Sequence, residues 1–292
     1  MRRRLEYLAD RWVLWSLRAT RAPELLARFY VRLLDRAVPK LRRVAFRNLA
    51  LALPETPEAE RKRIVAGSFG NLARLIAVFA QFGRIEQSTI HQYIRYEGFE
   101  NFEKAKQRGQ GVLFAAAHLG NWELSAYAHA LMAGAMHVVV RPLDNAKVNA
   151  MVEQLRAASG NTIHSKHGFA RAIVKALRNN KAVGILIDQN VALGEGIFID
   201  FFGHKACVST AFAKLANRTG AAMVPGYALW SESEHRFVLT FYPPLLPSGD
   251  EEADTRALHA HLEGVIRRHP EQWLWMHRRW KTRPAGEPDL YG

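Results

Sequence analysis

Hydrophobic residues in the first third of the chain recur at helical spacing. Between residues 23 and 38 they lie three and four positions apart, which predicts an amphipathic helix. Thr56 followed by Pro57 predicts an N-cap and a first helical residue, and the helix that they open should reach about residue 81. We therefore expect residues 1–95 to form a helical N-terminal region, the part of the chain that associates with a membrane.

The pattern changes after residue 96, where short apolar runs alternate with segments of helical periodicity. The expected strands are 112–117, 136–141, 183–188, 222–229 and 236–242. The expected helices are 121–133, 146–159, 169–179 and 210–219. This alternation predicts an α/β fold over residues 96–292, with a mixed, mostly parallel sheet flanked by helices.

The most informative motif is HLGNWE, which runs from His118 to Glu123 directly after the first expected strand. Gly120 permits a tight turn, and Asn121 is a suitable N-cap for the helix that follows. His118 is then expected at the carboxyl end of a strand, the edge where open α/β sheets bind their ligands. A carboxylate in the first helical turn could hold one ring nitrogen and leave the other to take a proton from a hydroxyl.

A structural role for the same residues is also open, because the spacing of His118 and Glu123 alone is no better than chance. In that alternative His118 bonds to backbone, and Glu123 only favours the helix dipole. Rival catalytic motifs are absent: the sequence has no G-x-S-x-G elbow, Walker loop, dinucleotide glycine pattern or H-E-x-x-H. The single Cys207 excludes an internal disulfide framework and a thiolate zinc cluster. The chemistry that remains is a histidine base acting on a bound hydroxyl.

Three further clusters lie at expected strand ends or loops. Arg141 follows the second strand and Arg156 comes one helix later, so either could hold a phosphate or an oxyanion, or form a surface ion pair. Asp188 ends the third strand. The apolar segment 194–203, which ends at Gly203, suits an apolar ligand, or is a buried strand that happens to be aromatic.

The chain is strongly basic, with 41 Lys and Arg against 27 Asp and Glu and a formal net charge of +14. Such a charge favours an anionic partner, either nucleic acid or an anionic membrane. Residues 271–281 interleave aromatic and basic side chains, including Arg278 and Arg279, a pattern that fits nucleotide stacking or a membrane interface. Composition does not separate the two.

No run of 18 apolar residues is present, so a transmembrane helix is not expected. The first residues do predict an amphipathic helix with Leu5, Leu8, Trp12 and Trp15 on one face and arginines around it. Such a helix can lie in a membrane interface or pack on the core of its own protein. Both alternatives are open at this point.

Taken together, these residues resemble the lysophospholipid acyltransferase superfamily, and more closely the bacterial lipid A biosynthesis (late) acyltransferases of the lauroyl and myristoyl transferase type. The resemblance runs nearly end to end. It rests on the segments 5–7, 47–49, 54–55, 118–123, 141–145, 188–189, 201–203, Pro225 and 277–284. The HLGNWE motif and the segment 277–284 are its most specific parts.

The resemblance implies transfer of an acyl chain from a thioester, on acyl carrier protein or coenzyme A, to a hydroxyl of an anionic lipid A precursor. It implies no metal and no cofactor, with His118 as general base and Glu123 as its orienting partner. Residues expected to bind substrate or stabilise the oxyanion are Asn121, Trp122, Arg141, Arg156, Asp188, Gly203, Arg278 and Arg279.

The resemblance also implies a place at the cytoplasmic face of the inner membrane. The family often has a continuous N-terminal anchor, which Asp10, Arg11 and Arg18 interrupt here, so peripheral or monotopic attachment is expected. Two alternatives remain: an acyltransferase for another polar lipid, such as a glycolipid, ornithine lipid or lysophospholipid, and a nucleic-acid-binding protein, which is the less favoured.

Overall fold

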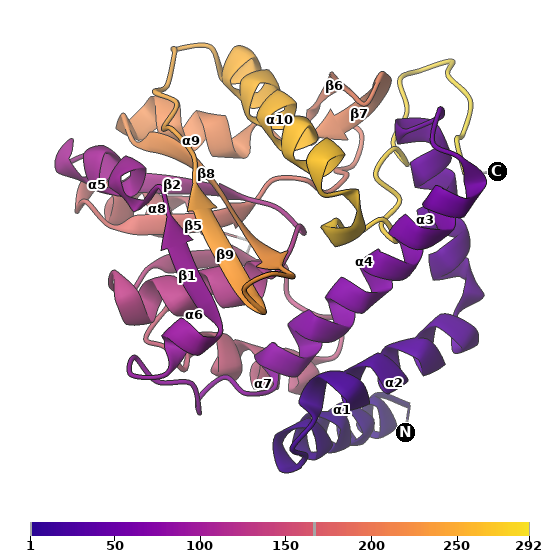
Figure 1. Cartoon of the computed structure of the whole chain (residues 1–292). Coiled ribbons are helices and arrows are strands. Elements are labelled where there is room, and N and C mark those ends of the chain that lie inside the picture. The colour runs from indigo at the N-terminus through magenta and orange to yellow at the C-terminus, as the bar shows by residue number, and fades with distance from the viewer. Residues whose placement is uncertain (1, 166–167, 292) are drawn as a thin grey trace.

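A seven-stranded sheet organises the computed structural model, which describes residues 2–165 and 168–291 (Figure 1). The strand order is β1-β9-β8-β2-β5-β3-β4, and every neighbouring pair is parallel except β8 and β9. The strands are β1 (Ile94–Glu97), β2 (Val112–Ala116), β3 (His137–Val140), β4 (Thr162–Ser165), β5 (Ala182–Leu186), β8 (Ala222–Ser231) and β9 (Arg236–Phe241). The mixed, mostly parallel sheet predicted from the sequence is confirmed.

Helices cover both faces of this sheet, and β2 shows why. Phe114 packs with α5 (Phe99–Gln107), α6 (Trp122–Met132) and α7 (Ala146–Ala157). Leu113 and Ala115 point to the other face, which is covered by α8 (Ala170–Arg178), α9 (Ala211–Thr219) and α10 (Glu251–Arg268). A strand buried on both faces is expected to be continuously apolar, as β2 is.

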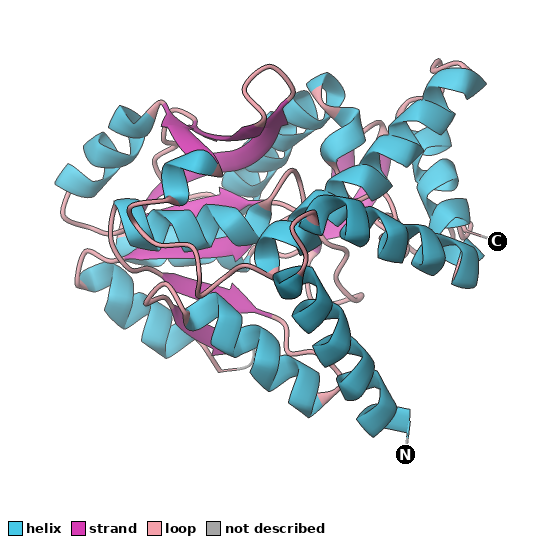
Figure 2. Cartoon of the chain, turned by 60° about the horizontal axis from the view of Figure 1, so that its bottom comes forward, coloured by secondary structure: helices cyan, strands magenta, loops and turns pink. Residues whose placement is uncertain are grey.

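The N-terminal helices form a separate layer at one side of the sheet (Figures 1 and 2). They are α1 (Arg2–Ala19), α2 (Pro23–Ala37), α3 (Pro39–Ala52) and α4 (Glu58–Phe79). Their buried side chains share one core with the last residues of the chain and with the hairpin of β6 (Ile197–Phe201) and β7 (His204–Val208). The division of the chain at residue 95 stays a prediction, and that boundary falls inside β1.

Two interpretations of local sequence need correction. The long helix begins at Glu58, with Pro57 at the cap position and no side-chain cap, one residue later than the pairing of Thr56 and Pro57 predicts. The segment 194–203 is mainly the aromatic strand β6 and its turn, and Phe201 and Phe202 pack with Trp273 in the core. Its aromatic character therefore serves packing and does not form a ligand surface.

The basic and aromatic tail is also core. Trp275, Trp280 and Arg279 are fully buried. A short 3₁₀ turn, Pro270–Gln272, leads from α10 into this segment, and another, Ile90–Gln92, precedes β1. A buried tryptophan cannot stack a nucleotide or reach a membrane interface. The aromatic and basic pattern of residues 271–281 therefore no longer supports nucleic-acid binding.

Candidate active site

The turn between β2 and α6 is built around Gly120, whose φ is 64°. A Cβ atom at this position would lie 1.9 Å from the carbonyl oxygen of Ala228, so only glycine fits. The side-chain oxygen of Asn121 accepts a hydrogen bond from the backbone N–H of Leu124 at 3.0 Å, which confirms the predicted N-cap. Asn121 is fully buried and its oxygen is committed to the helix. The turn thus fixes His118 at the carboxyl edge of the sheet.

Asp188 is the carboxylate that holds His118. His118 Nδ1 lies 2.9 Å from Asp188 Oδ1, and the backbone N–H of His118 donates to Oδ2 at 3.0 Å. The indole N–H of Trp273 donates to the same Oδ2 at 2.9 Å. Because β5 lies next to β2 in a parallel pair, the residues that follow the two strands meet at one edge of the sheet.

This environment keeps Asp188 ionised. Burial alone would raise the pKa of the Asp188 carboxyl, but the charge of His118 and hydrogen bonds from the His118 ring, the Trp273 indole and the His118 backbone outweigh it. The net pKa lies well below its ordinary value. A carboxylate beside Nδ1 favours the tautomer of the imidazole that carries its proton on that nitrogen.

The other ring nitrogen of His118 then has its lone pair available as a hydrogen-bond acceptor, and Gln189 uses it in this structure. Gln189 Nε2 lies 3.2 Å from His118 Nε2, so the amide N–H of Gln189 donates to this nitrogen. The ring of Trp122 stands 4.9 Å from the ring of His118, centroid to centroid, and is tilted against it. The His118 side chain is 15% exposed, so the ring is not completely covered by the protein.

Glu123 occupies a different place from the one the motif predicted. It forms a two-pronged ion pair with Arg156, at 2.6 Å and 2.9 Å, and no hydrogen bond joins it to His118 among the described residues. Burial would lower the pKa of Arg156, but hydrogen bonding and the charge of Glu123 outweigh it and leave the pKa above its ordinary value. Asp188, and not Glu123, is therefore the carboxylate bonded to the His118 ring.

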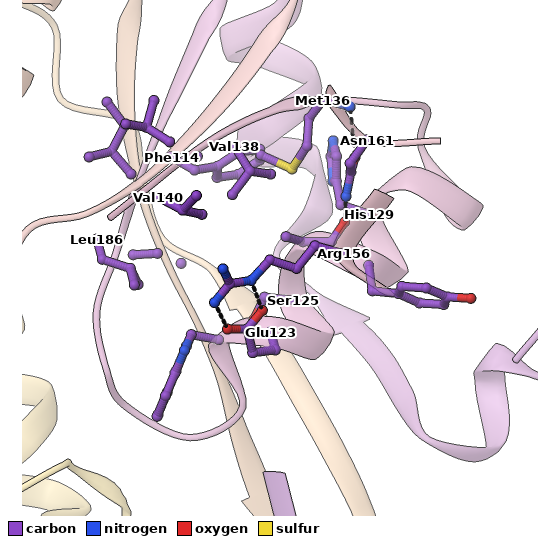
Figure 3. A pocket seen from close by; sticks show the side chains of 18 of the residues that line it. Phe114, Glu123, Ser125, His129, Met136, Val138, Val140, Arg156, Asn161 and Leu186 are labelled. Carbon is purple, nitrogen blue, oxygen red and sulfur yellow. Dashed lines mark hydrogen bonds and ion pairs between the residues drawn. The ribbon is translucent and has the colours of Figure 1, made fainter. Parts of the chain in front are cut away.

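An apolar pocket lies beside these groups, between the sheet and α6 (Figure 3). Figure 3 shows Arg156 reaching across it to Glu123, with Phe114, Val138 and Val140 on the strand side. Trp122, whose ring contacts His118, belongs to the same wall. The pocket is thus mostly hydrophobic and carries one partly buried ion pair, Glu123 with Arg156.

The remaining predicted residues lie at varying distances from this pocket. Arg141 is 70% exposed in the loop after β3. Gly203 is in the β6–β7 turn, where its N–H donates to Asp200, and Arg278 is half-buried over the ring of Tyr291. Arg279 has no exposed surface and donates to the carbonyl of Cys207, so it cannot bind a lipid headgroup.

Two site residues were missed from the sequence. The sequence indicated Gln189 only as part of the segment 188–189, and Trp273 only as part of residues 271–281. Residue type and position at a strand end could have drawn attention to Gln189. Trp273 lies 85 residues from Asp188 in the sequence, and no local pattern connects the two.

The fold and this edge of the sheet can now be compared with known proteins. A sequence model of the family described as bacterial lipid A biosynthesis acyltransferase matches residues 8–282. The lipid A biosynthesis palmitoleoyltransferase of Escherichia coli (strain K12) is 26% identical over 250 residues, which cover 85% of this chain and 81% of the relative. The myristoyltransferase of the same organism is 25% identical over 252 residues, or 86% and 78% of the two chains. Its lauroyltransferase is 25% identical over 252 residues, or 85% and 82%.

These matches define the chain as an acyltransferase. More narrowly, it belongs to the bacterial lipid A biosynthesis acyltransferase family.

Proposed function

We propose that this protein is a membrane-associated O-acyltransferase that moves a fatty acyl chain from an acyl carrier protein thioester to a hydroxyl of a lipid A precursor. His118 acts as the general base. The observation that carries the proposal is the bond between His118 Nδ1 and the buried Asp188 carboxylate, which leaves Nε2 as a proton acceptor beside an apolar pocket.

The reaction needs one proton transfer in each direction. His118 Nε2 takes the proton of the acceptor hydroxyl, and the hydroxyl oxygen attacks the carbonyl carbon of the thioester. The resulting tetrahedral oxyanion collapses, the carbon–sulfur bond breaks, and the thiolate leaves with the proton held by His118. Asp188 stabilises the imidazolium that exists between the two transfers.

Arg156 is placed to stabilise the developing oxyanion. Its Nη1 is buried and has no hydrogen-bond partner among the described residues, while Nε and Nη2 are both held by Glu123. An unpaired donor fixed in an apolar pocket is the arrangement that electrostatic stabilisation requires. In this scheme Glu123 is a positioning residue for Arg156, and Asp188, outside the motif, is the positioning residue for His118.

The apolar pocket supplies a place for the acyl chain. Its lining draws on strands β2, β3 and β5 and on α6, and includes Phe114, Met136, Val138 and Leu186. Apolar side chains favour a hydrocarbon over water by about 0.8 kcal/mol for each buried CH₂ group. The thioester carbonyl of a chain held there would lie near Arg156 and Trp122.

The exposed side chains of α1 support a location at the surface of a membrane, which we place at the cytoplasmic face of the inner membrane. No helix among the described residues is long and apolar enough to span a bilayer. Trp12 and Trp15 of α1 are 57% and 65% exposed, which supports the interfacial alternative for this helix. Asn145 donates to the carbonyl of Arg3 at 2.7 Å and so joins α1 to the loop at the active edge of the sheet.

The test uses purified full-length protein with acyl carrier protein thioester and a lipid A precursor, and mass spectrometry of the lipid product. The expected result is a mass increase of one acyl chain. Parallel reactions with acyl coenzyme A, and with a glycolipid, ornithine lipid or lysophospholipid acceptor, rank the donors and acceptors. Acylation of one of those lipids but not of the lipid A precursor would replace the acceptor, and salt-sensitive DNA binding with no acylation would contradict the enzyme proposal.

A further inference from the structure

A second cavity lies outside the active site, in the groove between α1 and α7. It has a volume of about 510 Å³ and is lined by three arginines, Arg11, Arg18 and Arg84, together with Trp15 and Leu155. None of the three guanidinium groups forms an ion pair with a carboxylate in the part of the chain that the structure describes. Three cations thus share one groove, and no carboxylate among the described residues pairs with them.

Backbone contacts hold two of these cations, Arg18 and Arg84, together. Arg18 donates to the carbonyls of Ala80 and Phe82 at 2.6 Å and 3.1 Å, and Arg84 donates to the carbonyl of Arg18 at 2.8 Å. Burial, and after it the charge of Arg84, lowers the pKa of Arg18. An anion bound in the groove would relieve this repulsion, and Arg guanidinium groups match phosphate oxygens with paired N–H donors.

The groove borders an exposed apolar surface, which we call the α1–α2 face. Trp15 belongs to both, and an edge-on contact of Trp12 with Tyr30, at 5.9 Å between centroids, joins the two helices. The face consists of Leu5, Leu8, Trp12, Trp15, Leu25, Phe29 and Leu33, each between 45% and 68% exposed. Exposed tryptophans beside arginines are typical of a protein surface that enters a membrane interface.

We propose that the groove binds the phosphate headgroup of an anionic phospholipid while the α1–α2 face lies in the acyl region of the same leaflet. The inference rests on the proposed membrane location and adds a lipid site distinct from the active site. Phe82 lines both cavities, so the lipid site is separated from the apolar pocket by that side chain. The chain would thus be held by one lipid class while it acylates another.

Vesicle flotation of the full-length protein tests this without any need for turnover. The vesicles are phosphatidylcholine alone or phosphatidylcholine with phosphatidylglycerol. The variant is Arg11→Gln/Arg84→Gln, since both side chains are exposed and Arg18, which holds backbone carbonyls, is left in place. Since a basic residue near an anionic surface contributes about 1 kcal/mol, binding to the anionic vesicles should fall roughly tenfold to thirtyfold. Binding to neutral vesicles should hardly change.

The matched control is Arg171→Gln/Arg178→Gln, which removes the same charge from exposed positions of α8. If the control loses as much binding to the anionic vesicles, the effect comes from net charge alone and the proposed lipid site is wrong. Flotation is repeated with inorganic phosphate and with chloride at equal ionic strength. If phosphate alone releases the protein completely from the anionic vesicles, the ligand of the groove is free phosphate and not a lipid headgroup. The His118→Ala variant should float like the parent, so that failure of catalysis and failure of lipid binding are distinguished.

Discussion

Replacement of Asp188 by asparagine separates the orientation of His118 from its presence. The carboxylate accepts hydrogen bonds from His118 Nδ1, the His118 backbone N–H and the Trp273 indole. An asparagine has one oxygen for these three donors, and its NH₂ group must face at least one of them. If it faces Nδ1, the imidazole proton moves to Nε2 and the base is lost.

The expected loss in kcat is roughly 10²- to 10⁴-fold, or about 3–5 kcal/mol of transition-state stabilisation, since the same change in a serine protease triad costs about 10⁴. KM should change little, because Asp188 is 3% exposed and so offers almost no surface to a substrate. The assay is steady-state acyl transfer followed by mass spectrometry. Circular dichroism and thermal melting check the fold.

Asp254→Asn is the matched control for this experiment. Asp254 is also a buried carboxylate, bonded to Asn217 at 2.7 Å and to the backbone N–H of Ser248. Its replacement should lower stability while leaving kcat near that of the parent. A folded Asp188→Asn variant with kcat within threefold of the parent would refute the reasoning, where threefold is about 0.7 kcal/mol.

Three further predictions concern the neighbouring residues. Glu123→Gln should lower kcat by roughly 10²-fold because Arg156 loses its positioning partner, and a product assay that shows no loss would exclude this role. Gly120→Ala should cost about 3 kcal/mol or more in the free energy of unfolding, since its Cβ would lie 1.9 Å from a carbonyl oxygen at a positive φ, and a urea midpoint equal to that of the parent would contradict the tight turn. Burial, aided by Lys106, lowers the pKa of His129 from 6.5 to about 4. The unfolded chain then takes up this proton first, so stability is lost as pH falls from 6.5 toward 4, by up to about 3 kcal/mol, and urea unfolding of His129→Leu should lack that part of the pH dependence.

The sequence could predict those parts of the fold that local pattern determines. β2 is continuously apolar, and it is followed by a turn glycine, Gly120, and an N-cap, Asn121, so the predicted positions of β2 and α6 are confirmed. β4 was missed because Thr162–Ser165 is a short edge strand with little apolar content. β1 was missed for a similar reason, since Ile94–Glu97 is a four-residue strand at the other edge of the sheet.

The candidate site shows the same division. His118 could be identified from its place at a strand end, but its partner depends on which strands are neighbours. Sequence spacing favoured Glu123, five residues away, whereas β5 brings Asp188 to the same edge from 70 residues away. The burial of Arg279 and of the C-terminal tryptophans likewise follows from packing against the N-terminal helices and the β6–β7 hairpin, which composition does not reveal.

The central claim is that His118 removes the proton from the acceptor hydroxyl. The most direct measurement is single-turnover acyl transfer by purified His118→Ala, with acyl carrier protein thioester and a lipid A precursor at saturating concentrations. The account predicts an unchanged melting temperature and a rate at least about 10³-fold below that of the parent. A folded variant that transfers the acyl chain at nearly the parental rate would contradict it.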